Sequence, residues 1–218
     1  MVHYIGIDDA GRGPVIGPMI LAGVLINSEE ENKLVEIGVK DSKLLSPSKR
    51  NMIGDILKNK FQFAIQEASP EEIDSSTNLN NLEAQKMAMV INELAQKVSG
   101  KIEVFVDCPS INELGWKSYL EIFIVDRERI EIKAEHKADA IYPVVSAASI
   151  IAKEKREEEV RNLKKEIGKD FGSGYPADPK TKEFLEKNLG DPIVDKIIRH
   201  SWSTVKKLKG KSEQGKLF

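Results

Sequence analysis

Residues 4–18 read YIGIDDAGRGPVIGP, and this stretch decides the fold. It places two adjacent carboxylates, Asp8 and Asp9, at the end of an apolar run and then continues with Gly-Arg-Gly at 11–13. Loose alternation of apolar residues indicates a strand. Neighbouring side chains of a strand point to opposite faces, so both carboxylates serve one site only if the strand ends or bulges there, as the glycines permit. The stretch predicts a cation site beside a phosphate site at the end of a strand.

The composition is that of a soluble globular protein with one main domain. The chain has 218 residues, of which 40% are hydrophobic and 31% charged, and its net charge is −2. The longest apolar stretch, Pro14–Ile26, is too short for a membrane span, and the chain has no basic segment followed by an apolar signal region. A cytoplasmic protein without membrane contact is therefore expected. The single cysteine, Cys108, excludes an internal disulfide and a zinc cluster, so any metal is held by oxygen ligands.

The first half of the chain is predicted to open with three successive strands. Hydrophobic periodicity places them at 2–9, 18–27 and 61–66, with a helix inserted from Ser46 and Pro47 to about Asn59. A helical stripe follows over 82–98, with Gly100 as its C-cap. Further strands are expected at 102–106, where the strand delivers Asp107, and at 120–125 and 130–133.

The second half of the chain is predicted to be mostly helical. A helical segment over 138–167, interrupted at Pro143, precedes a Gly- and Pro-rich loop over 171–179 and helices at 181–189 and 192–207. The fold class is therefore α/β, a mixed sheet flanked by helices with a C-terminal helical region. We divide the chain into a main domain over 1–165, a helical C-terminal part over 166–205 and a basic tail over 206–218.

Carboxylates end two of the predicted strands and open one helix. Asp8 and Asp9 end the first strand, Asp107 ends a later one, and Asp139 begins a helix. Each alone is explained by turn or capping chemistry, but three segments that converge would form an oxygen-only cluster suited to Mg²⁺ or Mn²⁺. Arg12 between two glycines is either a solvated turn residue or a bidentate phosphate ligand, and its place beside Asp8 favours the phosphate.

These motifs together resemble type 2 ribonuclease H (ribonuclease HII) of archaeal type, from about Tyr4 to Trp202. The matching blocks are ordered along the chain: GIDDAGRGPVIGP at 6–18, VKDSKLLS at 39–46, Val106-Asp107, HKADA at 136–140, YPVVSAASIIAK at 142–153 and GSGYP at 172–176. The family normally has Asp-Glu where this chain has Asp8-Asp9, so the second carboxylate is withdrawn by about 1.3–1.5 Å.

The resemblance implies a ribonuclease H-like fold and an endoribonuclease. The family hydrolyses RNA in RNA/DNA hybrids and incises 5′ of ribonucleotides embedded in duplex DNA, leaving 3′-hydroxyl and 5′-phosphate ends. Two Mg²⁺ or Mn²⁺ ions about 3.5–4 Å apart clamp the attacking water and the leaving oxygen in such a hydrolysis. Matched to the family motif, the catalytic and metal-binding residues are Asp8, Asp107, Asp139 and Asp9.

The same resemblance assigns the substrate contacts. The backbone of Gly11, Arg12 and Gly13 would contact the ribose 2′-hydroxyl, and Tyr175 would pack at the sugar of the following nucleotide. The alternative for Tyr175 is a half-buried residue that pins its loop. Phosphate contacts are expected from the hydroxyl and ammonium donors Lys43, Ser146 and Lys153, for which solvated surface is the competing interpretation.

The C-terminal tail faintly resembles a truncated peptide that binds a sliding clamp. Its matching residues are Gln214, Leu217 and Phe218, and the alternative is a disordered basic tail. The expected protein is a monomer whose partners are the RNA/DNA hybrid and ribonucleotide-containing duplex DNA. Other hypotheses are a phosphatase with Asp8 as nucleophile, another two-metal ribonuclease H-like nuclease, and a hybrid-binding module in which Asp9 impairs catalysis. The type 3 enzymes carry an extra N-terminal domain, for which a signature that begins at residue 4 leaves no room.

Overall fold

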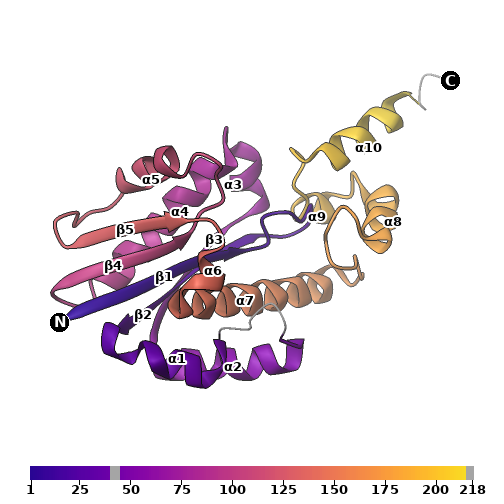
Figure 1. Cartoon of the computed structure of the whole chain (residues 1–218). Coiled ribbons are helices and arrows are strands. Elements are labelled where there is room, and N and C mark those ends of the chain that lie inside the picture. Colours follow the sequence, from indigo (N-terminus) through magenta and orange to yellow (C-terminus); the bar gives the residue numbers. More distant parts are fainter. Residues whose placement is uncertain (40–44, 215–218) are drawn as a thin grey trace. The chain divides into compact units, whose positions relative to one another are not determined.

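The chain folds into two compact units (Figure 1). The computed structural model describes residues 1–39 and 45–214. The sheet unit comprises Met1–Ala10, Ile20–Glu67 and Asn78–Lys155, and the helical unit comprises Gly11–Met19, Ala68–Thr77 and the chain from Arg156 onward. The division at residues 165 and 205 made from the sequence stays a prediction. No helix in the described part of the chain has the length and apolar character needed to cross a membrane.

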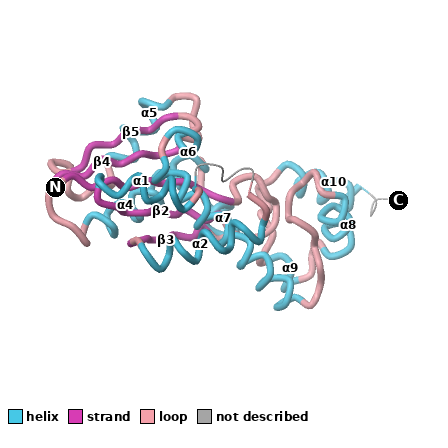
Figure 2. The backbone as a smooth tube through the Cα atoms, turned by 60° about the horizontal axis from the view of Figure 1, so that its bottom comes forward, coloured by secondary structure: helices cyan, strands magenta, loops and turns pink. Residues whose placement is uncertain are grey.

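A five-stranded mixed sheet forms the centre of the sheet unit. The strands are β1 (Val2–Ala10), β2 (Met19–Asn27), β3 (Gln62–Ala68), β4 (Lys101–Asp107) and β5 (Ile130–Glu135). They lie in the order β3-β2-β1-β4-β5, with β1 antiparallel to β2 and parallel to β4. Figure 2 shows the sheet with β5 and β3 at its two edges. The three opening strands and the mixed sheet predicted from the sequence are confirmed.

One face of the sheet is covered by α1 (Glu31–Ile37), α2 (Pro47–Lys60) and the first half of α7 (Pro143–Ile167). The short helices η1 (Ser28–Glu30) and α6 (Ala138–Ile141) precede α1 and α7. Gly6 of β1 permits close approach of α7, because a Cβ there would lie 2.2 Å from the Val144 carbonyl carbon. The helix start is therefore pressed directly against the central strand.

The opposite face is covered by α4 (Leu79–Ala95), against which α5 (Glu113–Glu121) packs. Gly23 of β2 has a similar role on this face, since a Cβ there would lie 2.5 Å from Val90 of α4 and 2.7 Å from Ile7 of β1. The two glycines thus place a helix on each side of the neighbouring strands β1 and β2.

The helical unit has its own hydrophobic core. It contains α3 (Pro70–Ser75), the second half of α7, α8 (Pro179–Asn188), α9 (Pro192–Asp195) and α10 (Ser203–Gln214). Its buried core residues are Val15, Ile16, Phe171, Phe184, Leu185, Val194, Ile197, Ile198 and Val205. Ile16 and Ile198 form an isolated antiparallel bridge, so the loop after β1 pairs with the segment that precedes α10.

Several predicted elements are wrong. Residues 120–125 do not form a strand: Leu120 and Glu121 end α5 and turns follow, because Trp116 and Leu120 form a buried helical stripe that the short apolar run conceals. The helix predicted over 192–207 is divided, because Ile197–Arg199 pairs with the loop after β1 instead of continuing α9. Gly100 is not the C-cap of α4, because the helix ends at Ala95 and its C-cap is Gln96. The helices α1, α3 and α5 were not expected.

Candidate functional site

Asp8 and Asp107 follow the last paired residues of two adjacent parallel strands. The parallel ladder between β1 and β4 ends with Ile7 opposite Val106, so the two aspartates come next on their strands. Asp8 is only 5% exposed, and its Oδ1 accepts a hydrogen bond of 2.7 Å from the N–H of Asp9. The sheet thus brings together two carboxylates that are 99 positions apart in the sequence, as the difference between their numbers shows.

Asp107 also connects the sheet to the helix that carries Asp139. Its Oδ1 accepts a 2.9 Å hydrogen bond from the N–H of Ala138, the first residue of α6. Asp139 follows directly and is buried. The Ser146 hydroxyl donates a short hydrogen bond to the Asp139 carbonyl oxygen, which joins α6 to α7. The three predicted carboxylates Asp8, Asp107 and Asp139 are therefore carried by segments that hydrogen-bond or pair with one another.

Asp9 is placed differently from Asp8 and Asp107. The strand neither ends nor bulges at Asp8 and Asp9, because the register with β2 continues unbroken to Ala10 opposite Ile20. This corrects the expectation that the strand stops there. Successive residues of a strand face opposite sides, so the Cβ of Asp9 leaves the sheet on the face away from Asp8. Gly6 of β1 and Phe105 of β4 both face α7. Asp8 and Asp107 each follow two residues later on the same strand, so both aspartates lie on this face of the sheet.

The electrostatics of the site favour a bound cation. Burial raises the pKa of Asp8 well above its usual value, and the negative charges of Asp9 and then Asp107 raise it further. The nearby Ser149 hydroxyl and the Asp9 N–H offset this only in part. A divalent ion would relieve both the repulsion and the unfavourable burial of charge. Asp8 therefore has the environment of a carboxylate that needs a positive partner.

The donor set fits a hydrated metal ion more closely than a fully enclosed one. Within residues 1–39 and 45–214, no three Asp, Glu, His or Cys side chains are arranged as a group that would hold a metal ion. Mg²⁺ usually binds through one or two carboxylates, keeps several waters and is completed by substrate phosphates. Asp8 and Asp107 would supply the two carboxylates that such a hydrated ion needs.

The three residues that the sequence predicts to contact phosphate differ in their surroundings. Ser146 is buried, and its hydroxyl donates to Asp139, so in this structure it supports the carboxylate segment. Lys153 is half-buried and lies on α7 four residues beyond Ser149, hence on the same side of that helix. Lys43 lies outside the described residues. Phosphate contacts by all three stay predictions.

The helical unit brings the Gly-Arg-Gly segment together with Tyr175. A Cβ on Gly13 would lie 3.4 Å from Cε1 of Tyr175, so the ring stands directly beside this glycine. The Tyr175 side chain is 48% exposed, which leaves it available to a ligand. The N–H of Val15 donates to the carbonyl of Gly174 at 2.8 Å and holds the two loops together. Gly11 has φ of +84°, a conformation that favours glycine.

Two residues that the sequence did not single out as functional support this loop. Arg199 and Trp202 donate hydrogen bonds to backbone carbonyls of the Gly-Arg-Gly segment. The only available signal was an arginine directly after the apolar pair Ile197-Ile198, which is compatible with a buried cation but does not indicate its partners.

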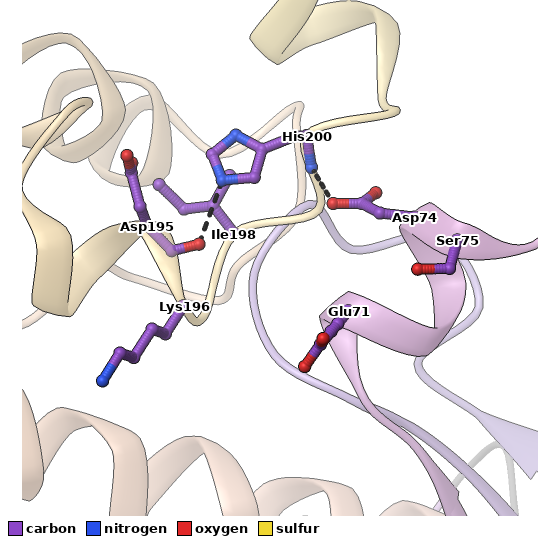
Figure 3. A pocket seen from close by; sticks show the side chains of 7 residues that line it. All are labelled: Glu71, Asp74, Ser75, Asp195, Lys196, Ile198 and His200. Atoms are coloured by element: carbon purple, nitrogen blue, oxygen red, sulfur yellow. Dashed lines mark hydrogen bonds between the residues drawn. The ribbon is translucent and has the colours of Figure 1, made fainter.

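A cavity of about 520 Å³ lies elsewhere in the helical unit, between α3 and the segment after α9 (Figure 3). It is lined by Glu71, Asp74, Ser75, Asp195, Lys196, Ile198 and His200. The Asp74 carboxylate accepts hydrogen bonds from the N–H groups of His200 and Ser201, and the His200 Nε2 lies 3.0 Å from the Asp195 carbonyl. These hydrogen bonds hold the backbone of the segment after α9 beside α3.

The five-stranded mixed sheet with its flanking helices has the ribonuclease H-like fold. The family model described as Ribonuclease HII matches residues 5–205. The chain belongs to the ribonuclease HII family, and it is a ribonuclease H endonuclease.

Individual relatives agree with this assignment. The ribonuclease HII of Pyrococcus furiosus is 45% identical over 93% of this chain and 89% of the relative. The crystal structure of ribonuclease H2 from Pyrococcus horikoshii superposes with a TM-score of 0.86 at 37% identity, over 97% of this chain and 99% of that one. A solved complex of PCNA with RNase HII from Archaeoglobus fulgidus gives 0.80 at 36% identity, covering 94% and 96%.

Proposed function

We propose that this protein hydrolyses the RNA strand of RNA/DNA hybrids and incises duplex DNA on the 5′ side of embedded ribonucleotides. The products would carry 3′-hydroxyl and 5′-phosphate ends. The observation that carries the proposal is the placement of Asp8 and Asp107 on neighbouring strands, each one residue beyond the last pair of the ladder between β1 and β4, with Asp139 joined to them through Ala138. Family membership supports the substrate class.

Asp8 and Asp107 would hold divalent cations, Mg²⁺ or Mn²⁺ and two of them, with Asp139 as a further ligand. Asp9, the fourth predicted ligand, would have to reach the ions from the opposite face of β1. When bound, such ions activate water and stabilise the charge on the leaving oxygen. The carboxylates keep their positions through the sheet and through the hydrogen bond from Ala138 N–H to Asp107. The proposal needs no protein nucleophile, which distinguishes it from a phosphatase that forms an aspartyl-phosphate on Asp8.

Selection of the ribonucleotide would come from the Gly-Arg-Gly segment and Tyr175. The exposed N–H of Gly13 can donate to a 2′-hydroxyl, which is absent from DNA. Tyr175 stands beside Gly13 and would pack on the neighbouring sugar. Arg12 would bind phosphate, and Lys43, Ser146 and Lys153 would add contacts to the backbone of the nucleic acid.

A sliding clamp is a second proposed partner. The Archaeoglobus fulgidus relative was solved as a complex with PCNA, and this chain ends in a sequence with Gln214, Leu217 and Phe218. Leu217 and Phe218 lie outside the described residues. Capture of the full chain by the cognate clamp, and its loss when residues 214–218 are removed, tests this partner; equal capture of both chains contradicts it.

The function is tested with one duplex that contains a single ribonucleotide, incubated with Mg²⁺ or Mn²⁺ and mapped at nucleotide resolution. Incision immediately 5′ of the ribonucleotide supports the proposal. Cleavage of long hybrids alone would favour another two-metal ribonuclease H-like nuclease. Binding of hybrids without metal-dependent cleavage would favour a binding module impaired by Asp9. Monomeric state and cytoplasmic location stay predictions.

A further inference from the structure

Arg199 is a fully buried arginine whose guanidinium binds the backbone of the Gly-Arg-Gly segment. Its side chain is 0% exposed. Nη2 donates to the carbonyl of Gly11 at 2.6 Å, Nη1 to that of Arg12 at 2.9 Å, and Nε to that of Gly17 at 2.9 Å. Arginine presents its donors in a rigid planar fork, so three bonds from three nitrogens fix the positions of these carbonyls.

Trp202 binds the remaining carbonyl of the Gly-Arg-Gly segment. Its indole Nε1 donates to the carbonyl of Gly13 at 3.2 Å, and the Arg199 guanidinium carbon lies 5.0 Å from the centre of its ring. A guanidinium over an indole at this distance is a favourable cation–π contact. All three carbonyls of the Gly-Arg-Gly segment therefore accept hydrogen bonds from two side chains that touch each other.

The segment that carries Arg199 is itself firmly held. The N–H of Arg199 donates to the carbonyl of Val15 at 2.9 Å, and the N–H of Gly17 donates to Ile197 at 2.8 Å. Directly after Arg199, the Asp74 carboxylate accepts from the N–H groups of His200 and Ser201 at 2.7 and 2.9 Å, the first of which Figure 3 shows. The backbone that carries Arg199 is therefore held in place by hydrogen bonds.

The carbonyl contacts determine where the N–H groups of the loop point. In a trans peptide the C=O of one residue and the N–H of the next point in opposite directions. Because Arg199 holds the carbonyl of Arg12, the N–H of Gly13, which belongs to the same peptide, is turned away from Arg199. No protein group in the described part of the chain accepts a hydrogen bond from Gly13 N–H, so this donor is left for a ligand.

We propose that Arg199, supported by Trp202, is a positioning residue for ribonucleotide recognition: it orients the Gly-Arg-Gly peptides so that the Gly13 N–H faces the ribose 2′-hydroxyl. This inference rests on the proposed function and adds a residue to it. Arg199 touches no substrate and acts only through the backbone that it holds.

Arg199→Lys tests the proposal, because lysine keeps the charge but its single ammonium cannot reproduce a fork that spans three carbonyls. Affinity is measured in EDTA, which prevents metal-dependent cleavage, for two otherwise identical duplexes, one with a single ribonucleotide and one all-DNA. We expect the ratio of the two affinities to fall about tenfold, the value of one hydrogen bond at the upper end of its usual range. Affinity for the all-DNA duplex should stay unchanged.

Arg129→Lys is the matched control. Arg129 also donates to two backbone carbonyls, those of Val98 and Gly100, but it lies in the sheet unit outside the proposed site. It should leave the affinity ratio unchanged. Trp202→Phe is the second test variant: it keeps an aromatic ring for Arg199 but removes the donor to Gly13, and a threefold fall in the ratio is expected. If Arg199→Lys does not fold, the affinity ratio of Trp202→Phe tests the inference.

The outcomes separate this inference from the proposed function. Selective loss of ribonucleotide preference supports positioning by Arg199. An equal loss of affinity for both duplexes, or an unchanged ratio in the folded variants, overturns the inference, while incision by the wild type in Mg²⁺ still supports the proposed function. A wild type that neither prefers the ribonucleotide nor cleaves overturns both.

Discussion

Asp8 and Asp107 lie on the same face of adjacent parallel strands, each one residue beyond the pair Ile7 and Val106 that ends the ladder. Ligands of open α/β sheets bind at the carboxyl ends of such parallel strands, where the ladder between the two neighbours stops. Burial and neighbouring negative charge raise the pKa of Asp8, so a cation bound at this point would stabilise the charged carboxylates.

Asp9→Glu should raise the cleavage rate or lower the metal concentration needed for half-maximal activity. The register of β1 directs the Asp9 Cβ to the face opposite Asp8, and glutamate adds one methylene, about 1.5 Å of reach. Cleavage is measured over a titration of Mg²⁺ and of Mn²⁺, with Asp9→Asn as the control that removes the charge at constant size. A glutamate variant no faster at any metal concentration counts against this role.

Tyr175→Ala should lower kcat/KM on a single-ribonucleotide duplex by about tenfold or more, as expected for the loss of an aromatic packing surface. Tyr175→Phe should lose less, because the ring beside Gly13 remains. Steady-state cleavage by the two variants separates packing from hydroxyl bonding. Wild-type activity in Tyr175→Ala would mean that the side chain serves only its own loop.

The loop that carries Tyr175 should become less stable in acid because of Asp178. This carboxylate accepts hydrogen bonds from the N–H and hydroxyl of Ser173 and from the N–H of Lys180, which lowers its pKa to about 2. A lowered folded-state pKa stabilises the fold above the unfolded value near 4, and this stabilisation is lost as pH falls toward about 2.

The measurement is the melting temperature of the wild type and of Asp178→Asn at pH 7, 4 and 2.5. The wild type should be the more stable at pH 7, and the difference should narrow below pH 4. A difference that stays constant over this range would show that the Asp178 charge does not contribute.

Gly6→Ala should destabilise the sheet unit by about 2 kcal/mol or more, because the new Cβ would overlap the backbone of Val144 at the start of α7. Chemical denaturation gives the free energy of unfolding. Gly210→Ala is the matched control, since a Cβ there meets nothing within 4 Å and alanine favours a helix. Equal stability of both variants would contradict the close approach of α7 to β1.

Local pattern was enough to predict the central strands and the carboxylates that follow them. Periodicity over 2–9 and 102–106 identified β1 and β4, and strand-end aspartates could then be assigned without knowledge of the pairing. The run over 120–125 was misassigned because a short apolar stretch has no period that separates the end of a helix from a strand. The packing of α5 on α4 determines that the start of this run is helical.

The support of the Gly-Arg-Gly segment could not be predicted from the sequence. Arg199 lies 188 residues from Gly11, and its partners are backbone carbonyls, which every residue possesses and no sequence motif marks. The same pairing interrupted the helix predicted over 192–207, because Ile198 forms a bridge to Ile16, and Ile197 and Arg199 hydrogen-bond to Gly17 and Val15. Long-range backbone contacts overrode helix propensity there.

The most direct test of the account is single-turnover cleavage of a single-ribonucleotide duplex by Asp8→Asn and Asp107→Asn, with substrate affinity measured in parallel. Each variant should cleave at least about a hundredfold more slowly in Mg²⁺ and Mn²⁺ while it still binds the duplex, because its fold and its helical unit are unchanged. Cleavage at the wild-type rate by either variant would contradict the claim that this pair of carboxylates forms the catalytic site.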